Sequence, residues 1–168
     1  MNVFLINLDK DADRLAAATK QLSDYGVSFE WIPAVLAKEF TKEKQRSFIN
    51  GWRWWLAVGR AWRPGEIGCA LSHFKIYRRM VEEDIPCACV LEDDVLLSGN
   101  LRERLDRLED FIDPKLPQVI LLSCHHGKKM DGFEIVATDT DMFTEAYVIT
   151  RTAAIALLKE NVPLKTPC

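Results

Sequence analysis

The 168-residue sequence lacks several features that would each define a class of protein. No apolar run approaches the roughly 20 residues that cross a bilayer. The first residues have neither the basic start nor the small-residue cleavage site of a secretory signal, so we expect a cytoplasmic protein. Neither sign of charge dominates, because 22 Lys and Arg stand against 25 Asp and Glu, a net charge of −3. Non-specific nucleic-acid binding depends on a basic surface, and we therefore expect no nucleic-acid partner.

The cysteines do not form a disulfide framework, because there are five of them, an odd number. A structural zinc site is not expected either, since Cys87 and Cys89 form a C-x-C pair without a matching second pair. On a strand these two side chains share one face, where we expect them to be small buried packing residues.

Glycine-rich phosphate loops are also missing. The sequence contains neither G-x-x-x-x-G-K-[ST] nor G-x-G-x-x-G. A G-x-S-x-G nucleophile elbow and an H-E-x-x-H zinc helix are absent too. These absences count against a P-loop kinase, a dinucleotide dehydrogenase and a serine hydrolase. A diphosphate held by a metal ion remains consistent with the sequence, and a nucleotide sugar is one substrate of that kind.

Short apolar runs alternate with amphipathic segments along the chain, and this alternation predicts an α/β fold with a mostly parallel sheet. Asn100 and Thr152 are expected to cap helices, and Gly26 to end one. The expected strands cover residues 3–8, 27–32, 87–91, 119–122, 133–136 and 146–149, and the expected helices residues 11–25, 66–83, 101–112 and 153–159.

The segment of residues 38–64 interrupts this alternation. It begins with charged residues and then carries four of the five tryptophans, among them Trp52, Trp54 and Trp55. We interpret it as a Trp-rich insertion with a short helix. Two functions remain open for its aromatic rings: they either stack on an acceptor sugar or pack as the small core of the insertion. Neighbouring arginines also fit contact with a membrane surface.

Three consecutive carboxylates, Glu92, Asp93 and Asp94, close the expected strand at residues 87–91. Like charges at the end of a buried strand repel one another and need a cation or strong donors. In extended geometry Glu92 and Asp94 point to one side. Two oxygen ligands there suit Mg²⁺ or Mn²⁺ together with a substrate diphosphate. The alternative is a solvated acidic turn.

Glu66 and His73 lie seven residues apart on the helix expected at residues 66–83, so they are nearly in line along it. We expect them to line the site beside the acidic triplet, and Ser72 to point away and bond to backbone. The alternative is a Glu favoured at a helix start and a half-buried His.

Arg14 follows the first strand and is placed to meet a phosphate or a uracil. A basic turn at residues 125–129 is better explained by solvation.

Four motifs in this order resemble glycosyltransferase family 25, which includes bacterial lipopolysaccharide and lipooligosaccharide sugar transferases and enzymes that galactosylate collagen. They are Asn7-Leu8-Asp9 with Asp13-Arg14, Gly65-Glu66-Ile67-Gly68-Cys69-Ala70-Leu71-Ser72-His73, Val90-Leu91-Glu92-Asp93-Asp94-Val95 and Ala146-Tyr147-Val148-Ile149-Thr150-Arg151. The resemblance implies a GT-A-like, three-layer nucleotide-sugar-binding fold and an inverting transfer of a sugar, often galactose, from a UDP-sugar to a glycolipid acceptor.

The resemblance also implies site residues. Glu92 and Asp94 would hold Mn²⁺ or Mg²⁺, as the counterpart of a D-x-D motif. The donor would be bound by Asn7, Arg14, Glu92 and Tyr147. Inversion needs a base for the acceptor hydroxyl, and Glu66, His73 and Asp93 all remain open for that role. Trp52, Trp54 and Trp55 are the candidates for acceptor contact.

Family members generally continue well beyond the last of these motifs. We therefore expect a single domain at residues 1–168 that is incomplete on its acceptor side. Such a chain would bind a donor weakly, self-associate and transfer sugar poorly, and it would work at the cytoplasmic face of a membrane. Two alternatives stay open: a nucleotide-sugar-binding module without activity, and a haloacid-dehalogenase-like phosphohydrolase. The second is disfavoured because its nucleophile must be Asp where this chain has Glu92.

Overall fold

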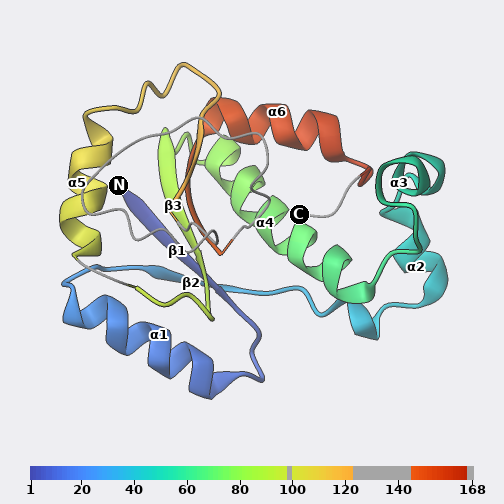
Figure 1. Ribbon diagram of the computed structural model, residues 1–168, viewed down its shortest axis with the longest axis horizontal. Coiled ribbons are helices and arrows are strands. Elements are labelled where there is room, and N and C mark those ends of the chain that lie inside the picture. Colours follow the sequence, from blue (N-terminus) through green and yellow to red (C-terminus); the bar gives the residue numbers. More distant parts are fainter. Residues whose placement is uncertain (98–99, 123–144, 166–168) are drawn as a thin grey trace.

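The alternating apolar and amphipathic segments fold into a five-stranded sheet between two helical layers (Figure 1). The computed structural model describes residues 1–97, 100–122 and 145–165. Its strands are β1 (Asn2–Asn7), β2 (Glu30–Pro33), β3 (Cys87–Glu92), β4 (Val119–Leu121) and β5 (Ala146–Thr150). Its helices are α1 (Ala12–Asp24), the 3₁₀ turn η1 (Ala37–Glu39), α2 (Lys42–Ser47), α3 (Gly51–Val58), α4 (Pro64–Glu82), α5 (Leu101–Glu109) and α6 (Arg151–Asn161).

The strand order is β2-β1-β3-β5-β4, and β1 runs parallel to both β2 and β3. Strand β5 runs antiparallel to its two neighbours, β3 and β4. The predicted α/β fold is confirmed: the sheet is mixed, mostly parallel at its centre, and consistent with a GT-A-like glycosyltransferase fold. This topology brings the carboxyl ends of β1 and β3 and the start of β5 to one edge of the sheet.

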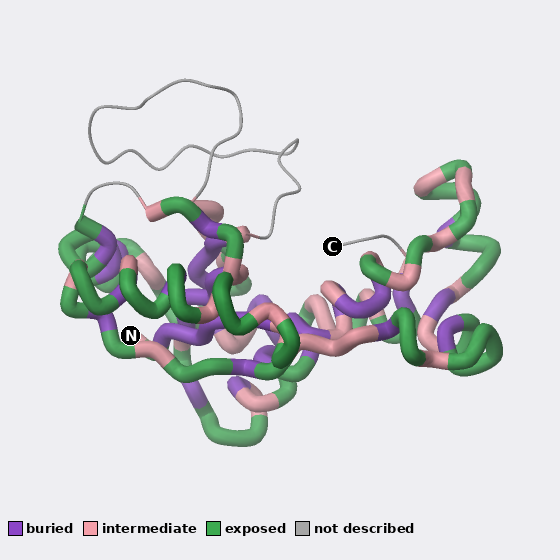
Figure 2. Tube along the Cα trace, turned by 90° about the horizontal axis from the view of Figure 1, so that it is seen from below, coloured by how far each residue is buried: buried purple, intermediate pink, exposed green. Residues whose placement is uncertain are grey.

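Alternate residues of the strands face two separate cores. One core lies against α4 and α6 and includes Phe4, Val90 and Tyr147. The other lies against α1 and α5 and includes Leu5 and Leu91. Buried residues therefore run through the middle of the molecule, and the outward faces of the helices are exposed (Figure 2). No helix within the described residues is both long and apolar enough to cross a bilayer.

Helix α4 is buried on more than the one apolar face that an amphipathic surface helix buries. Ser72, His73, Ile76 and Met80 are all buried, whereas Leu71 is only half-buried. The reason is that α4 packs against α6 and η1 in addition to the sheet. Ser72 bonds to backbone as predicted, since its hydroxyl donates to the Gly68 carbonyl (2.7 Å) and accepts from Val35 N–H (2.8 Å).

Several predicted boundaries are wrong by a few residues. The second strand begins at Glu30 rather than at residue 27. Helix α6 is capped by Thr150 and not by Thr152, because the Thr150 hydroxyl accepts from Ala153 N–H. The predicted Asn100 cap of α5 is confirmed. The strand predicted at residues 133–136 lies outside the described residues.

The Trp-rich segment forms η1, α2 and α3, where the sequence predicted one short helix. Helices α2 and α3 lie beyond the N-terminal end of α4 (Figure 1). Leu164, which follows α6, holds this segment in place: its N–H donates to the Phe48 carbonyl and its carbonyl accepts from Asn50 N–H, both at 2.8 Å. Residues far apart in the sequence thus form one small packing unit.

Gly68 permits the close approach of α4 to the chain before η1. A Cβ at this position would overlap the Val35 carbonyl oxygen and lie 3.4 Å from Ala37 N. The obstacle is backbone, which yields less readily than the end of a side chain. We expect Gly68→Ala to lower the free energy of unfolding by about 1–3 kcal/mol, measured by urea denaturation.

Gly65→Ala is the matched control on the same helix, because no heavy atom lies within 4 Å of a Cβ there. Its stability should stay unchanged or rise by up to about 1 kcal/mol, the helix preference of Ala over Gly. Equal stability of the two variants would contradict the tight packing at Gly68.

Candidate functional site

Polar side chains gather where β1 and β3 end. Asn7 is the last residue of β1 and Glu92 the last of β3, with Asp93 and Asp94 in the turn that follows. Glu145 immediately precedes β5, and its carbonyl accepts from Glu92 N–H (2.8 Å). Ligands of open α/β sheets bind beyond the carboxyl ends of the strands. The site predicted from the acidic triplet therefore lies at the expected edge.

Asp93 is held by two donors from the first strand and helix. The Asn7 amide donates to Asp93 Oδ2 (2.7 Å) and to the Asp11 carbonyl (3.0 Å). Arg14 donates to Asp93 Oδ1 (3.4 Å) and lies 4.0 Å from Asp94 Oδ2. The structure thus brings together Asn7, Arg14 and the acidic triplet, although they are about 80 residues apart in the chain.

Negative charge is crowded at this edge. Partial burial raises the pKa of the Asp94 carboxyl, and Glu92, Asp93 and Glu145 raise it further by repulsion. An acid whose pKa rises on folding destabilises the folded state when it is ionised. A bound cation would relieve this repulsion.

The residues at this edge fit a hard divalent ion. The available donors are carboxylate oxygens, which Mg²⁺ and Mn²⁺ prefer. The Asn7 side-chain oxygen is buried and accepts no hydrogen bond from the described residues. A buried, unsatisfied oxygen of this kind leaves room for a further partner, such as a ligand or a water.

Glu92 does not share a side with Asp94 in the way extended geometry predicts. Strand β3 ends at Glu92, so the alternation of side chains stops before Asp94. Glu92 instead faces α4, where its Oε1 lies 3.3 Å from His73 Nε2. Asp93 contacts Asn7 on β1, and Asp94 is exposed.

His73 belongs to a buried hydrogen-bonded chain. Its Nδ1 lies 2.7 Å from the Tyr147 hydroxyl, which lies 2.9 Å from the Tyr77 hydroxyl. Burial lowers the pKa of the His73 imidazole, but hydrogen bonds to Cys69 and Glu92 raise it more, to about 9. Tyr147 is 2% exposed, so it supports His73 from within the core, and direct donor contact does not fit its position.

Glu66 is engaged at the start of α4. Its carboxylate forms an ion pair with Arg60 and accepts from Arg63 N–H (2.7 Å). The hydrogen bond from Arg60 lowers the pKa of the Glu66 carboxyl, and the Arg63 N–H lowers it further. Glu66 therefore serves the helix start, and the structure gives it no contact with the acidic triplet among the described residues.

The three tryptophans on α3 differ in exposure. Trp54 is 1% exposed and its indole N–H donates to the Arg60 carbonyl (3.0 Å), so it is the core of the segment and not an acceptor contact. Trp52 and Trp55 are 66% and 61% exposed. With Leu56 they form an exposed apolar face at positions i, i+3 and i+4 of the helix.

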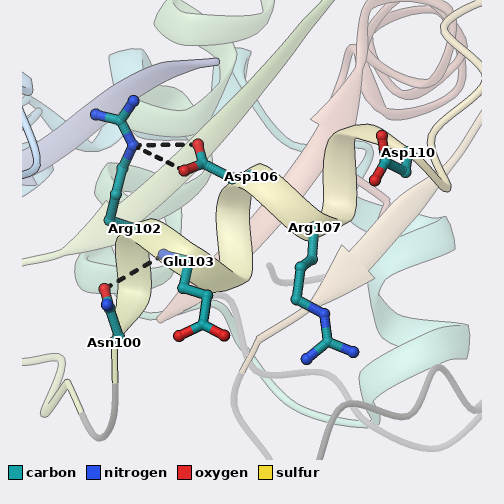
Figure 3. A pocket seen from close by; sticks show the side chains of 6 residues that line it. All are labelled: Asn100, Arg102, Glu103, Asp106, Arg107 and Asp110. Atoms are coloured by element: carbon teal, nitrogen blue, oxygen red, sulfur yellow. Dashed lines mark hydrogen bonds and ion pairs between the residues drawn. The ribbon is translucent and has the colours of Figure 1, made fainter.

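A shallow hollow on α5 lies apart from these residues (Figure 3). Its lining is charged: Arg102 pairs with Asp106, and Asn100 accepts from Glu103 N–H at the helix cap. These contacts explain it as the solvated face of one helix. The basic turn at residues 125–129 lies outside the described residues.

Sequence reasoning missed Cys69 and Tyr77 as neighbours of the site. Cys69 lies four residues before His73 and Tyr77 four residues after it, a spacing that places all three along one side of a helix. This i, i+4 spacing is the signal in the sequence for the proximity of the three residues. It does not single them out, because core packing explains Cys69 and Tyr77 equally well.

His73 provides a pH-dependent prediction for the metal-free protein. Its ring should titrate well above 6.5 and near 9 in an NMR titration. Because the folded pKa is raised, His73 stabilises the fold fully below about pH 6.5, and this contribution is lost as pH rises through about 9.

Glu92→Gln should lower the pKa of the His73 imidazole. A neutral amide is a weaker hydrogen-bond acceptor than a carboxylate, so it opposes less strongly the effect of burial, which lowers this pKa. Glu82→Gln, on the exposed end of α4, is the matched control and should leave the pKa unchanged. A His73 pKa at or below 6.5 in the parent protein would contradict the role of Glu92.

Known proteins with similar sequences indicate the family of this chain. The family model described as glycosyltransferase family 25 (LPS biosynthesis protein) matches residues 1–168. A glycosyltransferase 25 family member of Drosophila pseudoobscura pseudoobscura is 33% identical over 111 residues, covering 64% of this chain and 18% of the relative. Human procollagen galactosyltransferase 2 is 27% identical over 115 residues, covering 66% and 18%.

A bovine relative is named a probable inactive glycosyltransferase 25 family member 3; it is 28% identical over 178 residues, covering 97% of this chain and 29% of the relative. The chain thus spans between 18% and 29% of the length of these three relatives. Because the family model matches from the first residue to the last, the chain belongs to glycosyltransferase family 25.

Proposed function

We propose that this chain forms the donor-binding part of a glycosyltransferase that moves a sugar, galactose in particular, from a UDP-sugar to a glycolipid such as a lipopolysaccharide. The observation that carries the proposal is the cluster of Glu92, Asp93 and Asp94 beside Arg14 at the carboxyl edge of the sheet. Family membership supports sugar transfer, and a relative named as a galactosyltransferase supports the choice of sugar.

In this proposal Asp94 and Glu92 hold Mn²⁺ or Mg²⁺. When bound, such an ion neutralises the charge that develops on the diphosphate as the sugar–phosphate bond breaks. Arg14 is 59% exposed and able to leave Asp93 for a phosphate oxygen of the donor. The buried Asn7 amide keeps Asp93 in place while Arg14 moves.

An inverting transfer needs a base near the acceptor hydroxyl. Of the three predicted candidates we retain Asp93. Glu66 is tied to Arg60, and the His73 ring is 2% exposed and contacts Tyr147 and Glu92. Asp93 lies on the carboxylate edge, and its Oδ1 loses the Arg14 contact when Arg14 turns to the donor.

The exposed face of Trp52, Trp55 and Leu56 suits the acceptor. Aromatic rings stack on the apolar face of a pyranose, and the same face fits the surface of the membrane that carries a lipid-linked sugar. We therefore propose that the protein works at the cytoplasmic face of a membrane.

A second candidate is a binding module that holds the donor without transferring sugar. It is favoured by relatives that are named inactive or probably inactive members of the family. The two candidates differ in one measurement: UDP-galactose turnover in the presence of Mn²⁺ and a galactose-ended acceptor. Donor binding without turnover would select the module.

The phosphohydrolase alternative loses support, because the chain belongs to a glycosyltransferase family. Self-association stays a prediction.

Asp94→Asn tests the metal-binding role. It should abolish the Mn²⁺-dependent strengthening of UDP binding in calorimetry. It should also preserve or raise the stability of the metal-free protein at neutral pH, because it removes one charge from a repelling group. Asp110→Asn, at the exposed end of α5, is the matched control and should leave both properties unchanged. Unchanged metal dependence in Asp94→Asn would remove Asp94 from the proposal.

Trp52→Ala and Trp55→Ala test the acceptor face. Each should weaken binding of a galactose-ended oligosaccharide about fivefold, the equivalent of about 1 kcal/mol. Stability should change by less than about 0.5 kcal/mol, because both rings are exposed. Trp31→Ala, a half-exposed tryptophan on β2, is the control. An equal loss of binding in all three variants would argue against a specific face.

A further inference from the structure

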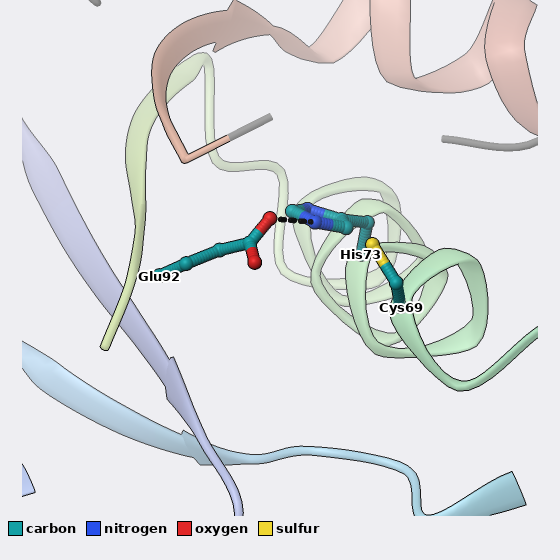
Figure 4. Close-up of side chains that lie close together, drawn as sticks. All are labelled: Cys69, His73 and Glu92. Carbon is teal, nitrogen blue, oxygen red and sulfur yellow. Dashed lines mark hydrogen bonds and ion pairs between the residues drawn. The ribbon is translucent and has the colours of Figure 1, made fainter. Parts of the chain in front are cut away.

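We propose that Cys69, His73 and Glu92 form a second metal site, for a borderline transition-metal ion of the zinc class, which shares Glu92 with the carboxylate site. One ligand atom from each of these residues lies within 4.8 Å of the others. Figure 4 shows Cys69 and His73 on α4, with Glu92 reaching toward them from β3. The inference does not depend on the proposed function.

The fold brings these three side chains together through two regular elements. Cys69 and His73 are four residues apart on α4, so they lie one above the other on a single face of the helix. Glu92 occupies a position of β3 that faces α4, like Ala88 and Val90 before it. Ligands on a helix and a strand are held more precisely than ligands on loops.

The donor set differs in chemistry from the neighbouring carboxylates. It offers one thiolate sulfur, one imidazole nitrogen and one carboxylate oxygen. Thiolate and imidazole ligands select zinc-like ions, whereas Mg²⁺ and Mn²⁺ prefer oxygen. Three protein ligands leave the fourth position of a tetrahedral ion open, the pattern found in catalytic zinc sites.

A second layer of contacts orients the histidine. The Tyr147 hydroxyl lies 2.7 Å from His73 Nδ1 and is itself supported by the Tyr77 hydroxyl. When metal binding displaces the Nε2 proton to solvent and Nδ1 donates to Tyr147, the Nε2 lone pair is available to a metal on the side of Glu92. Metal-binding histidines commonly donate their second nitrogen in this way.

Half-burial also favours the site. His73 is almost fully buried, while Cys69 and Glu92 are half-buried, so an ion has access from one side. The pair predicted from sequence to lack zinc chemistry, Cys87 and Cys89, lies on the opposite face of β3. Burial raises the pKa of both thiols, that of Cys89 to about 12, and so disfavours their thiolate forms.

Cobalt(II) is the probe, because a thiolate bound to tetrahedral Co²⁺ gives a charge-transfer band in the near ultraviolet. The complete 168-residue chain, freed of metal, should develop this band with one equivalent of Co²⁺, and Zn²⁺ should remove it. Cys69→Ser should abolish the band. Cys87→Ser is the matched control, since Cys87 is also half-buried, and it should retain the band.

Two further variants separate this site from the carboxylate site. Tyr147→Phe should weaken Co²⁺ binding about tenfold, because the histidine loses its orienting partner. Asp94→Asn should keep the band even where it abolishes Mn²⁺-dependent UDP binding, so the two proposals fail separately. The weak spectrum of octahedral Co²⁺ in the parent chain, or a band that survives in Cys69→Ser, would overturn the inference.

Discussion

The contact between His73 and Glu92 joins helix α4 to strand β3 at the edge of the sheet, and the candidate site depends on it. The His73 ring is held on its other side by Tyr147, so β5 is tied into the same arrangement. Three elements distant in sequence are thereby fixed around one carboxylate. Because Glu92 is held toward α4, the remaining acidic residues turn toward β1 and solvent.

This division of the acidic triplet creates two different chemical environments within one short segment. On the β1 side, the carboxylates of Asp93 and Asp94 lie near Arg14. On the α4 side, Glu92 meets a thiol and an imidazole. A folded protein accepts crowded, partly buried charges of this kind at a cost in stability, and ligand binding commonly offsets that cost.

The Trp-rich segment is built into the fold through backbone contacts and not through the site. Leu164 pairs with residues on either side of Ile49, and Trp54 fills the small core of the segment. Its exposed aromatic face is consequently free to differ among proteins that share the same sheet.

By itself, the sequence determined the order of strands and helices, because apolar periodicity and capping residues act over a few positions. It also pointed to Arg14 and the acidic triplet, since parallel strands bring their carboxyl ends to one edge, and the family resemblance added Asn7. Only the tertiary structure decided which way each side chain faces. Strand β3 ends at Glu92, and this local event, set by packing against α4 and β5, overrides the alternation expected from sequence. The burial of Trp54 has the same cause, because partners from elsewhere in the chain decide which rings of an aromatic helix are enclosed.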